Sequence, residues 1–448
     1  MARHHPTAPI TAEEATHDLL RRLGQVRAGT GGVVLVLAVL AVAGLVALVA
    51  LIASGPEPRA KWGYAAATLG FLVSAAQGAP IVAFATRLAK GFWGIPLRRA
   101  AELFAVSGIV TTPLYIVLLF QLPDWRGRPS VWFDWPGAPL LWDSIAIVMF
   151  SLAGLALLYL SSRPDFAAAR DAGIRGPFQR LALGWIGTVR QWQVLSGGIV
   201  VLGGLYLMFY PYMHMFLAVD LGMSLVPGWK SAVFAPYHGV SGLQASLAST
   251  LLAAAALRHF GGLQRYIGLA PFWGAAKILL ALSLLFFYFT WSEFMPTWYG
   301  RTPEEIFVLE LLFFGPYLWL FILSFSLNFI LPFLLLIWNP IRVSIKGPTF
   351  VAALVLIGNF IDRLRIYVAS WSVAGPVGQH LEHAPPTHYP GLPDLLILVG
   401  GPAAVVLLYL LALRFIPPIS LWEFKNGLLL TRERPYVKTE VAVVAKPR

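Results

Sequence analysis

Long apolar runs separated by short polar segments recur along this chain of 448 residues. Ten of the runs are uncharged or nearly uncharged and reach about 20 residues, the length that a helix needs to cross a bilayer. They cover residues 32–53, 63–86, 103–122, 144–162, 192–215, 234–257, 266–292, 306–337, 348–371 and 395–413. The pattern predicts an all-α polytopic integral membrane protein with about ten transmembrane helices. The eighth run is longer than one crossing requires, so we expect it to tilt, to protrude or to kink at Pro316 or Pro332.

The polar ends of the chain divide it into three predicted regions. Residues 1–31 contain TAEEATHDLLRRLGQ, which is typical of an amphipathic surface helix and begins with a capping box from Thr11 to Glu14. Residues 32–415 form the transmembrane domain, and residues 416–448 form a C-terminal tail. All extramembrane segments are too short for a soluble catalytic domain, so we do not expect this chain to be catalytic alone.

Composition supports the membrane assignment and adds an orientation. Apolar residues make up 58% of the chain and charged residues 12%, against about half and a quarter in a soluble protein. If successive loops alternate sides, one side carries 24 Lys and Arg and the other 6. The positive-inside rule then places both termini in the cytoplasm, and the net charge of +12 needs no nucleic-acid partner. With no cysteine, the chain cannot ligate an iron–sulfur cluster through thiolates.

Four titratable residues fall at the helix ends on the less basic side. His214 and Asp220 lie in YPYMHMFLAVDLGMSLVPGW, Asp143 lies in PLLWDSIA, and Glu293 lies in TWSEFMPTW. Tryptophans 142, 229, 291 and 298 accompany them. One interpretation is a wet interface with an aromatic belt. The other is a site that exchanges protons with a quinol, because oxidation of quinol releases two protons and a histidine and a carboxylate are suitable acceptors.

A second set of charged residues lies deeper in the predicted helices. Its members are Glu102, Lys277, Glu310, Asp362, Arg363 and Arg365. Charges inside a bilayer are costly and usually face a partner or a water-filled path. Two interpretations stay open, namely ion pairs that fix helix packing, for example Asp362 with Arg365, and a proton path.

The histidines allow two further interpretations. His380, His383 and His388 have a spacing that a metal site would need, but they lie in a Pro-rich external loop where a chance cluster is the simpler explanation. His214 and His238 could serve as axial ligands of a haem from neighbouring helices.

Several motifs spread over residues 90–372 carry a resemblance to a known family. They are FWGIPLRRAAEL, PLLWDSIAI with LLYLSSRPDFAAARD, HMFLAVDLGMSLVPGWKSAVFAPY, GPYLWLFILSFSLNFILP and IGNFIDRLRIYVAS. The chain resembles the NrfD/PsrC family, the quinone-interacting membrane subunits of polysulfide-reductase-type complexes, and most closely its ten-helix branch in alternative complex III. In that branch a histidine, an aspartate six residues later and a Pro-Gly-Trp lie beside the quinone pocket. Here these are His214, Asp220 and Trp229 with the two residues before it.

The resemblance implies an arrangement and a function. It implies two four-helix bundles, helices 2–5 and 6–9, flanked by helices 1 and 10. It implies a site for menaquinone or ubiquinone near the outer face, with Asp143 in it, docked beneath an iron–sulfur subunit of a larger respiratory complex. It further implies a prokaryotic inner membrane and a proton path touching Glu102, Asp362 and Arg363, for which Lys277 and Glu293 are further candidates.

The chain departs from the family pattern at one place that matters. The family commonly has a histidine shortly before Gly-Arg-Pro, whereas this chain reads LPDWRGRP, so that Asp124 or Trp125 stands there. Asp124 is therefore the candidate replacement in the site. The alternatives to a quinone-binding redox subunit are a secondary transporter, a b-type cytochrome subunit and a structural anchor with a degenerate quinone site.

Overall fold

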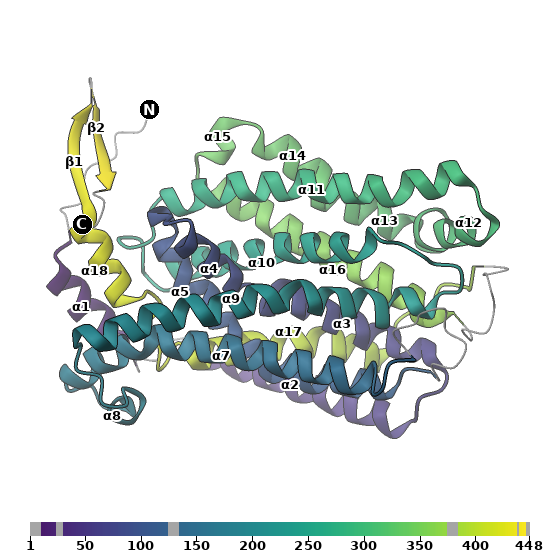
Figure 1. Ribbon diagram of the computed structural model, residues 1–448, viewed down its shortest axis with the longest axis horizontal. Coiled ribbons are helices and arrows are strands. Elements are labelled where there is room, and N and C mark those ends of the chain that lie inside the picture. Colours follow the sequence, from purple (N-terminus) through teal and green to yellow (C-terminus); the bar gives the residue numbers. More distant parts are fainter. Residues whose placement is uncertain (1–9, 24–29, 124–133, 374–383, 437–438, 445–448) are drawn as a thin grey trace.

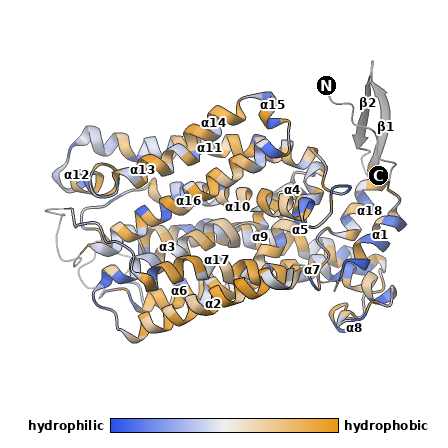
Figure 2. Cartoon of the chain, turned by 180° about the vertical axis from the view of Figure 1, so that it is seen from behind, coloured by the Kyte–Doolittle hydropathy of each residue, from blue (hydrophilic) through white to orange (hydrophobic). Residues whose placement is uncertain are grey.

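The computed structural model describes residues 10–23, 30–123, 134–373, 384–436 and 439–444. Its long helices lie side by side along one direction (Figure 1), and hydrophobic residues dominate their middle parts (Figure 2). Among the described residues, nine helices are long and apolar enough to cross a membrane. They span Gly31–Ala53, Arg59–Leu88, Phe92–Phe120, Leu140–Asp171, Val189–Leu225, Phe234–His259, Ala270–Gly300, Leu318–Leu336 and Leu392–Ala412. The prediction of an all-α polytopic membrane protein is confirmed.

A tenth long helix runs within the same bundle. Helix α16 (Lys346–Ser372) has 27 residues and packs against α3 (Gly63–Leu72) and α10 (Phe234–His259). It is less apolar than the other nine because Asp362, Arg363 and Arg365 lie in it, and all three are buried. The charges of α16 therefore face protein rather than lipid.

The helices between the two ends of the chain form two groups. The first consists of α3, α4 (Pro80–Leu88), α6 (Gly108–Phe120), α7 (Leu140–Asp171) and α9 (Val189–Asp220). The second consists of α10, α11 (Ala270–Gly300), α13 (Leu318–Phe325), α14 (Leu331–Leu336) and α16. The groups meet where α3 packs on α16 and where α10 packs on both α9 and the π-helical segment η2 (Val73–Gln77). Residues on these five elements can therefore interact across the boundary.

Helices α2 (Thr30–Ala53) and α17 (Leu392–Ala412) form a pair beside the first group. They approach through two glycines, since a Cβ placed on Gly44 would lie 2.8 Å from the Cα of Gly400. Small residues of this kind let membrane helices pack closely. Much of the remaining surface of α2 is exposed and apolar, with Leu35 66% exposed, as expected for a helix that faces lipid.

The eighth predicted helix is interrupted rather than straight. Helix α12 (Pro303–Leu309) and the π-helical segment η7 (Glu310–Phe314) end at Gly315, and α13 starts at Leu318. A second π-helical segment, η8 (Ser326–Ile330), joins α13 to α14. The break thus occurs at Pro316, one of the two prolines at which a kink was predicted, because proline removes a backbone donor.

The two terminal regions fold against the same end of the bundle (Figure 1). Helix α1 (Ala12–Arg21) starts with the predicted capping box of Thr11 and Glu14. The end of the chain forms α18 (Leu421–Leu430) and an antiparallel hairpin of β1 (Thr431–Tyr436) and β2 (Thr439–Val444). The start of the predicted tail is part of the folded protein, since Ile419, Leu421 and Glu423 are buried.

Candidate functional site

Two histidines from neighbouring helices meet in the interior. His214 of α9 and His238 of α10 are both fully buried, and their Nδ1 atoms lie 2.8 Å apart. The Nε2 atom of His238 lies 2.9 Å from the hydroxyl of Tyr367 on α16. Gly242 makes room for this arrangement, because a Cβ at that position would lie 2.4 Å from Cε1 of His214. The three side chains form a hydrogen-bonded row across three helices.

The row can be satisfied by two proton arrangements. A hydrogen bond between two ring nitrogens needs one N–H and one lone pair. If Tyr367 donates to His238, then His238 donates to His214, and His214 carries its proton on Nε2. In the other arrangement, Nε2 of His238 donates to Tyr367, Nδ1 of His214 donates to His238, and Nε2 of His214 is an acceptor. The row can therefore pass a proton between Nε2 of His214 and Tyr367.

The same geometry is incompatible with a haem held between these two histidines. Axial ligands lie on opposite faces of the porphyrin. Here the ring centroids are 4.9 Å apart and the rings are hydrogen-bonded directly to each other. A haem would require the two rings to separate, so the arrangement described does not support the haem interpretation.

Two carboxyl groups form a second buried cluster. Asp143 near the start of α7 and Asp220 at the end of α9 are fully buried, and their side chains interact. The hydroxyl of Tyr115 on α6 donates to Oδ2 of Asp143 at 2.7 Å. A hydrogen bond between two carboxyl groups requires that one of them carries a proton. This cluster can thus hold a proton and exchange it.

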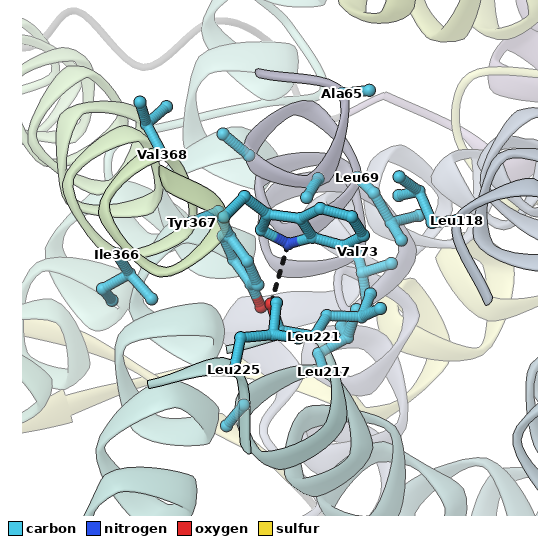
Figure 3. Packing of buried hydrophobic residues seen from close by; sticks show 14 of the residues in the cluster. Ala65, Leu69, Val73, Leu118, Leu217, Leu221, Leu225, Ile366, Tyr367 and Val368 are labelled. Carbon is cyan, nitrogen blue, oxygen red and sulfur yellow. Dashed lines mark hydrogen bonds between the residues drawn. The ribbon is translucent and has the colours of Figure 1, made fainter. Parts of the chain in front are cut away.

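Apolar side chains surround Tyr367, the end of the histidine row. Figure 3 shows Leu69 and Val73 on one side of the tyrosine and Leu217 and Leu221 on another. The indole of Trp371 also donates to the carbonyl of Leu221 at 2.9 Å (dashed in Figure 3). The titratable groups therefore border a tightly packed hydrophobic region built from α3, α6, α9 and α16.

The loop after α9 covers this region and is fixed to α11. Gly228 adopts a positive φ of 81°, which lets the chain turn back so that Trp229 is buried. The Trp229 indole donates to Oε1 of Glu293 at 3.2 Å, and the Ser231 hydroxyl donates to Oε2. Glu293 thus anchors the Pro-Gly-Trp loop. Asp124 lies outside the described residues.

The deep charges of α16 form a paired network next to the histidines. Asp362 accepts from Arg365 at 2.8 Å, as predicted, from Arg363 at 3.1 Å and from Tyr237 at 2.8 Å. Arg363 also donates to the carbonyl of His238 at 2.9 Å and to the Ser74 hydroxyl in η2 at 3.1 Å. The network connects both helix groups to the histidine row.

Neutral polar side chains continue from this network into each group. In the first group, Gln77 donates to Ser151 at 2.8 Å and accepts from Thr111 at 2.5 Å. In the second, Gln244 donates to Ser283 at 2.9 Å and to the carbonyl of Asn328 at 2.8 Å. The sequence did not predict these contacts, because a single amide or hydroxyl side chain within an apolar run is common in a membrane helix.

A cluster of ion pairs closes the end that carries α1 and α18. Glu102 pairs with Arg87 and Arg99, Arg99 pairs with Asp165 at 2.7 Å, and Glu423 of α18 pairs with both Arg87 and Arg98. We call these six residues the ion cluster. It explains why the third helical span starts at Phe92 rather than at residue 103, because its charges are neutralised within the protein.

Other predicted residues lie apart from these groups. Lys277 is exposed on α11, where its ammonium group stacks on Trp273 at 4.0 Å, so it does not join the buried network. Glu310 is likewise exposed at the start of η7. His380 and His383 lie outside the described residues, and within the described part no group of three or more His, Asp or Glu side chains could hold a metal ion.

Comparison with known proteins adds no relative to this picture. No protein-family model matches the sequence, and no curated protein matches it significantly.

Proposed function

We propose that this protein is the quinone-binding membrane subunit of a multisubunit respiratory oxidoreductase. The observation that carries the proposal is that Nε2 of His214 and Oδ1 of Asp143 are buried without a hydrogen-bond partner among the described residues. Buried polar atoms in native proteins nearly always have partners. The two carbonyl oxygens of a quinone, or the two hydroxyls of a quinol, supply partners of the required kind. The motif resemblance to the NrfD/PsrC family supports the same ligand.

The chain's own residues would handle the two protons of the reaction. Oxidation of quinol to quinone releases two protons and two electrons. One proton passes to Nε2 of His214, in the arrangement in which that atom carries a lone pair, and is then held by the pair of histidines. The other passes to the pair formed by Asp143 and Asp220. Both electrons leave to an iron–sulfur subunit docked on the outer face, and the reverse sequence reduces quinone.

The distribution of charge supports an orientation for this function. The end with α1 and α18 belongs to the side that carries 24 of the Lys and Arg residues, so it would face the cytoplasm of a prokaryotic cell. The histidine row and the carboxyl pair then lie toward the outer face. The Asp362 network and the glutamines beneath it supply groups that a coupled proton path would need.

A secondary transporter is the second candidate, and one observation favours it. Transporters often contain discontinuous membrane helices at their substrate sites. Here the eighth helix is interrupted at Gly315 and contains two π-helical segments, and Arg365 donates to the carbonyl of Leu312 inside the first of them at 3.1 Å. A transporter would bind its solute without a quinone or a redox partner.

Quinone binding by the purified full chain tests the proposal. The assay measures binding of a short-chain quinone to the protein in nanodiscs by quenching of tryptophan fluorescence. His214→Gln should weaken binding about tenfold, since losing one buried hydrogen bond costs about 1 to 2 kcal/mol. His17→Gln, which changes an exposed histidine of α1, is the matched control. Unchanged binding in a folded His214→Gln protein, or no binding in the wild type, would refute the proposal.

A further inference from the structure

A cavity opens between α10 and α16 at the end of the bundle that carries α1. Its volume is about 570 Å³. It is lined by Leu252, Ala255, Arg258, His259, Gln264, Ile345, Lys346, Thr349, Phe350 and Ala353. Arg22, which follows α1, donates to the carbonyl of Gly261 in the adjacent loop at 2.8 Å. The cavity therefore lies at the more basic end, away from the histidine row.

The lining changes from basic to apolar along the helix axis. Arg258, His259 and Lys346 lie at the helix ends, whereas Leu252 and Ala353 lie further inside. With a rise of about 1.5 Å per residue, Leu252 is about 9 Å deeper than Arg258. None of the lining residues, all of which the structure describes, is acidic. The cavity thus combines a cationic rim with an apolar wall about as deep as a headgroup and the first acyl carbons.

The guanidinium group at the rim is held in place by the backbone. Arg258 donates to the carbonyl of Gln264 at 2.8 Å and to that of Ile267. These bonds fix its position without cancelling its charge, because no carboxylate takes part. Lys346 is exposed beside it at the start of α16, where the helix dipole also favours an anion.

We propose that this cavity binds an anionic phospholipid. The phosphate would contact Arg258 and Lys346, and an acyl chain would lie along Leu252, Phe350 and Ala353. A free phosphate ion would leave the apolar wall uncovered, and a neutral lipid would leave the cations unmatched. Anionic lipids are attracted to basic residues of this kind at the cytoplasmic surface.

Native mass spectrometry of the delipidated full chain tests this site. The protein is titrated separately with phosphatidylglycerol, phosphatidylcholine and inorganic phosphate. Lys346→Gln should weaken phosphatidylglycerol binding about fivefold, equivalent to about 1 kcal/mol for one charge near a lipid surface. Ala353→Trp should abolish it by filling the apolar part. Lys425→Gln, which removes a charge from α18 at the same end, is the matched control.

The outcomes separate the ligands. Selective binding of phosphatidylglycerol that both variants weaken and the control does not would support the proposal. Equal binding of the two lipids, unchanged binding in both variants, or binding of phosphate that Ala353→Trp leaves intact would overturn it.

Discussion

Glu423 provides the sharpest test of how the C-terminal region is held. Its carboxylate is 3% exposed and contacts Arg87 at 2.9 Å and Arg98 at 2.7 Å. Burial by itself would raise the pKa of Glu423, but the charges and hydrogen bonds of Arg87 and Arg98 outweigh burial and lower that pKa to about 2. The ion pairs should therefore stabilise the folded protein.

The magnitude and its pH dependence follow from that pKa. The usual value for this carboxyl is 4.5, and the difference from about 2 corresponds to about 3 kcal/mol of stability. Because the pKa in the folded state is the lower one, the contribution is complete above pH 4.5 and is lost as the pH falls toward 2. About 2 kcal/mol should already be lost at pH 3.

Equilibrium unfolding in mixed micelles, followed by tryptophan fluorescence, measures this contribution. Glu423→Gln should lower the free energy of unfolding by about 3 kcal/mol at pH 7, since it leaves two buried arginines undercompensated. The difference between wild type and variant should shrink to about 1 kcal/mol at pH 3. Glu13→Gln, at an exposed position of α1, should have almost no effect. A Glu423→Gln difference that is absent at pH 7, or that does not change with pH, would refute the role of the ion pairs.

Three further substitutions test the described contacts. Gly242→Ala should weaken quinone binding about tenfold in the fluorescence assay by displacing His214, whereas Gly239→Ala, whose Cβ meets only an ordinary contact at 3.7 Å, should not. Asp362→Asn should reduce the free energy of unfolding by about 3 to 5 kcal/mol, because Arg363 and Arg365 lose a buried partner, and a loss below that of Tyr237→Phe would contradict this. Gly400→Leu should destabilise the protein by about 1 to 3 kcal/mol by separating α17 from α2, while Gly32→Leu, with nothing nearby, serves as its control.

The repeated long apolar runs predicted the helical architecture, because a helix needs a minimum apolar length to cross a bilayer. The same rule predicted that the long eighth run would tilt, protrude or kink at Pro316 or Pro332, and the structure interrupts it at Gly315 and Pro316. The capping box at Thr11 was predicted from a separate pattern, the one that starts a helix. The rule of apolar length missed the charged turns at Arg98, Arg99 and Glu102, whose charges are neutralised by Glu423, Asp165 and Arg87 respectively. Those partners lie up to 336 residues apart in the sequence, so no local pattern could reveal them.

The candidate site was predictable in its charged members but not in its neutral ones. His214, Asp220 and Asp143 are conspicuous because charge is rare in apolar runs. Tyr115 and Tyr367 are not, since tyrosine is common in membrane helices. The sequence paired His238 with His214 only as possible haem ligands, whereas in the structure the two rings are hydrogen-bonded directly to each other. Lys277 shows that a charge within an apolar run need not be buried, because a lysine can lie on the surface and cover it with its aliphatic stem.

Charge compensation distinguishes the two ends of the molecule. In the ion cluster, Arg87, Arg98 and Arg99 balance Glu102, Asp165 and Glu423, so adding or removing a proton would leave a buried charge uncompensated. Asp143 instead interacts with Tyr115 and with Asp220, a second carboxyl. In the histidine row, one proton can enter at Nε2 of His214 while another leaves at Tyr367, so that the row keeps its net charge. Proton exchange is therefore energetically easier at the histidine row and the carboxyl pair than at Glu102, which favours these two groups as the quinone site that we propose.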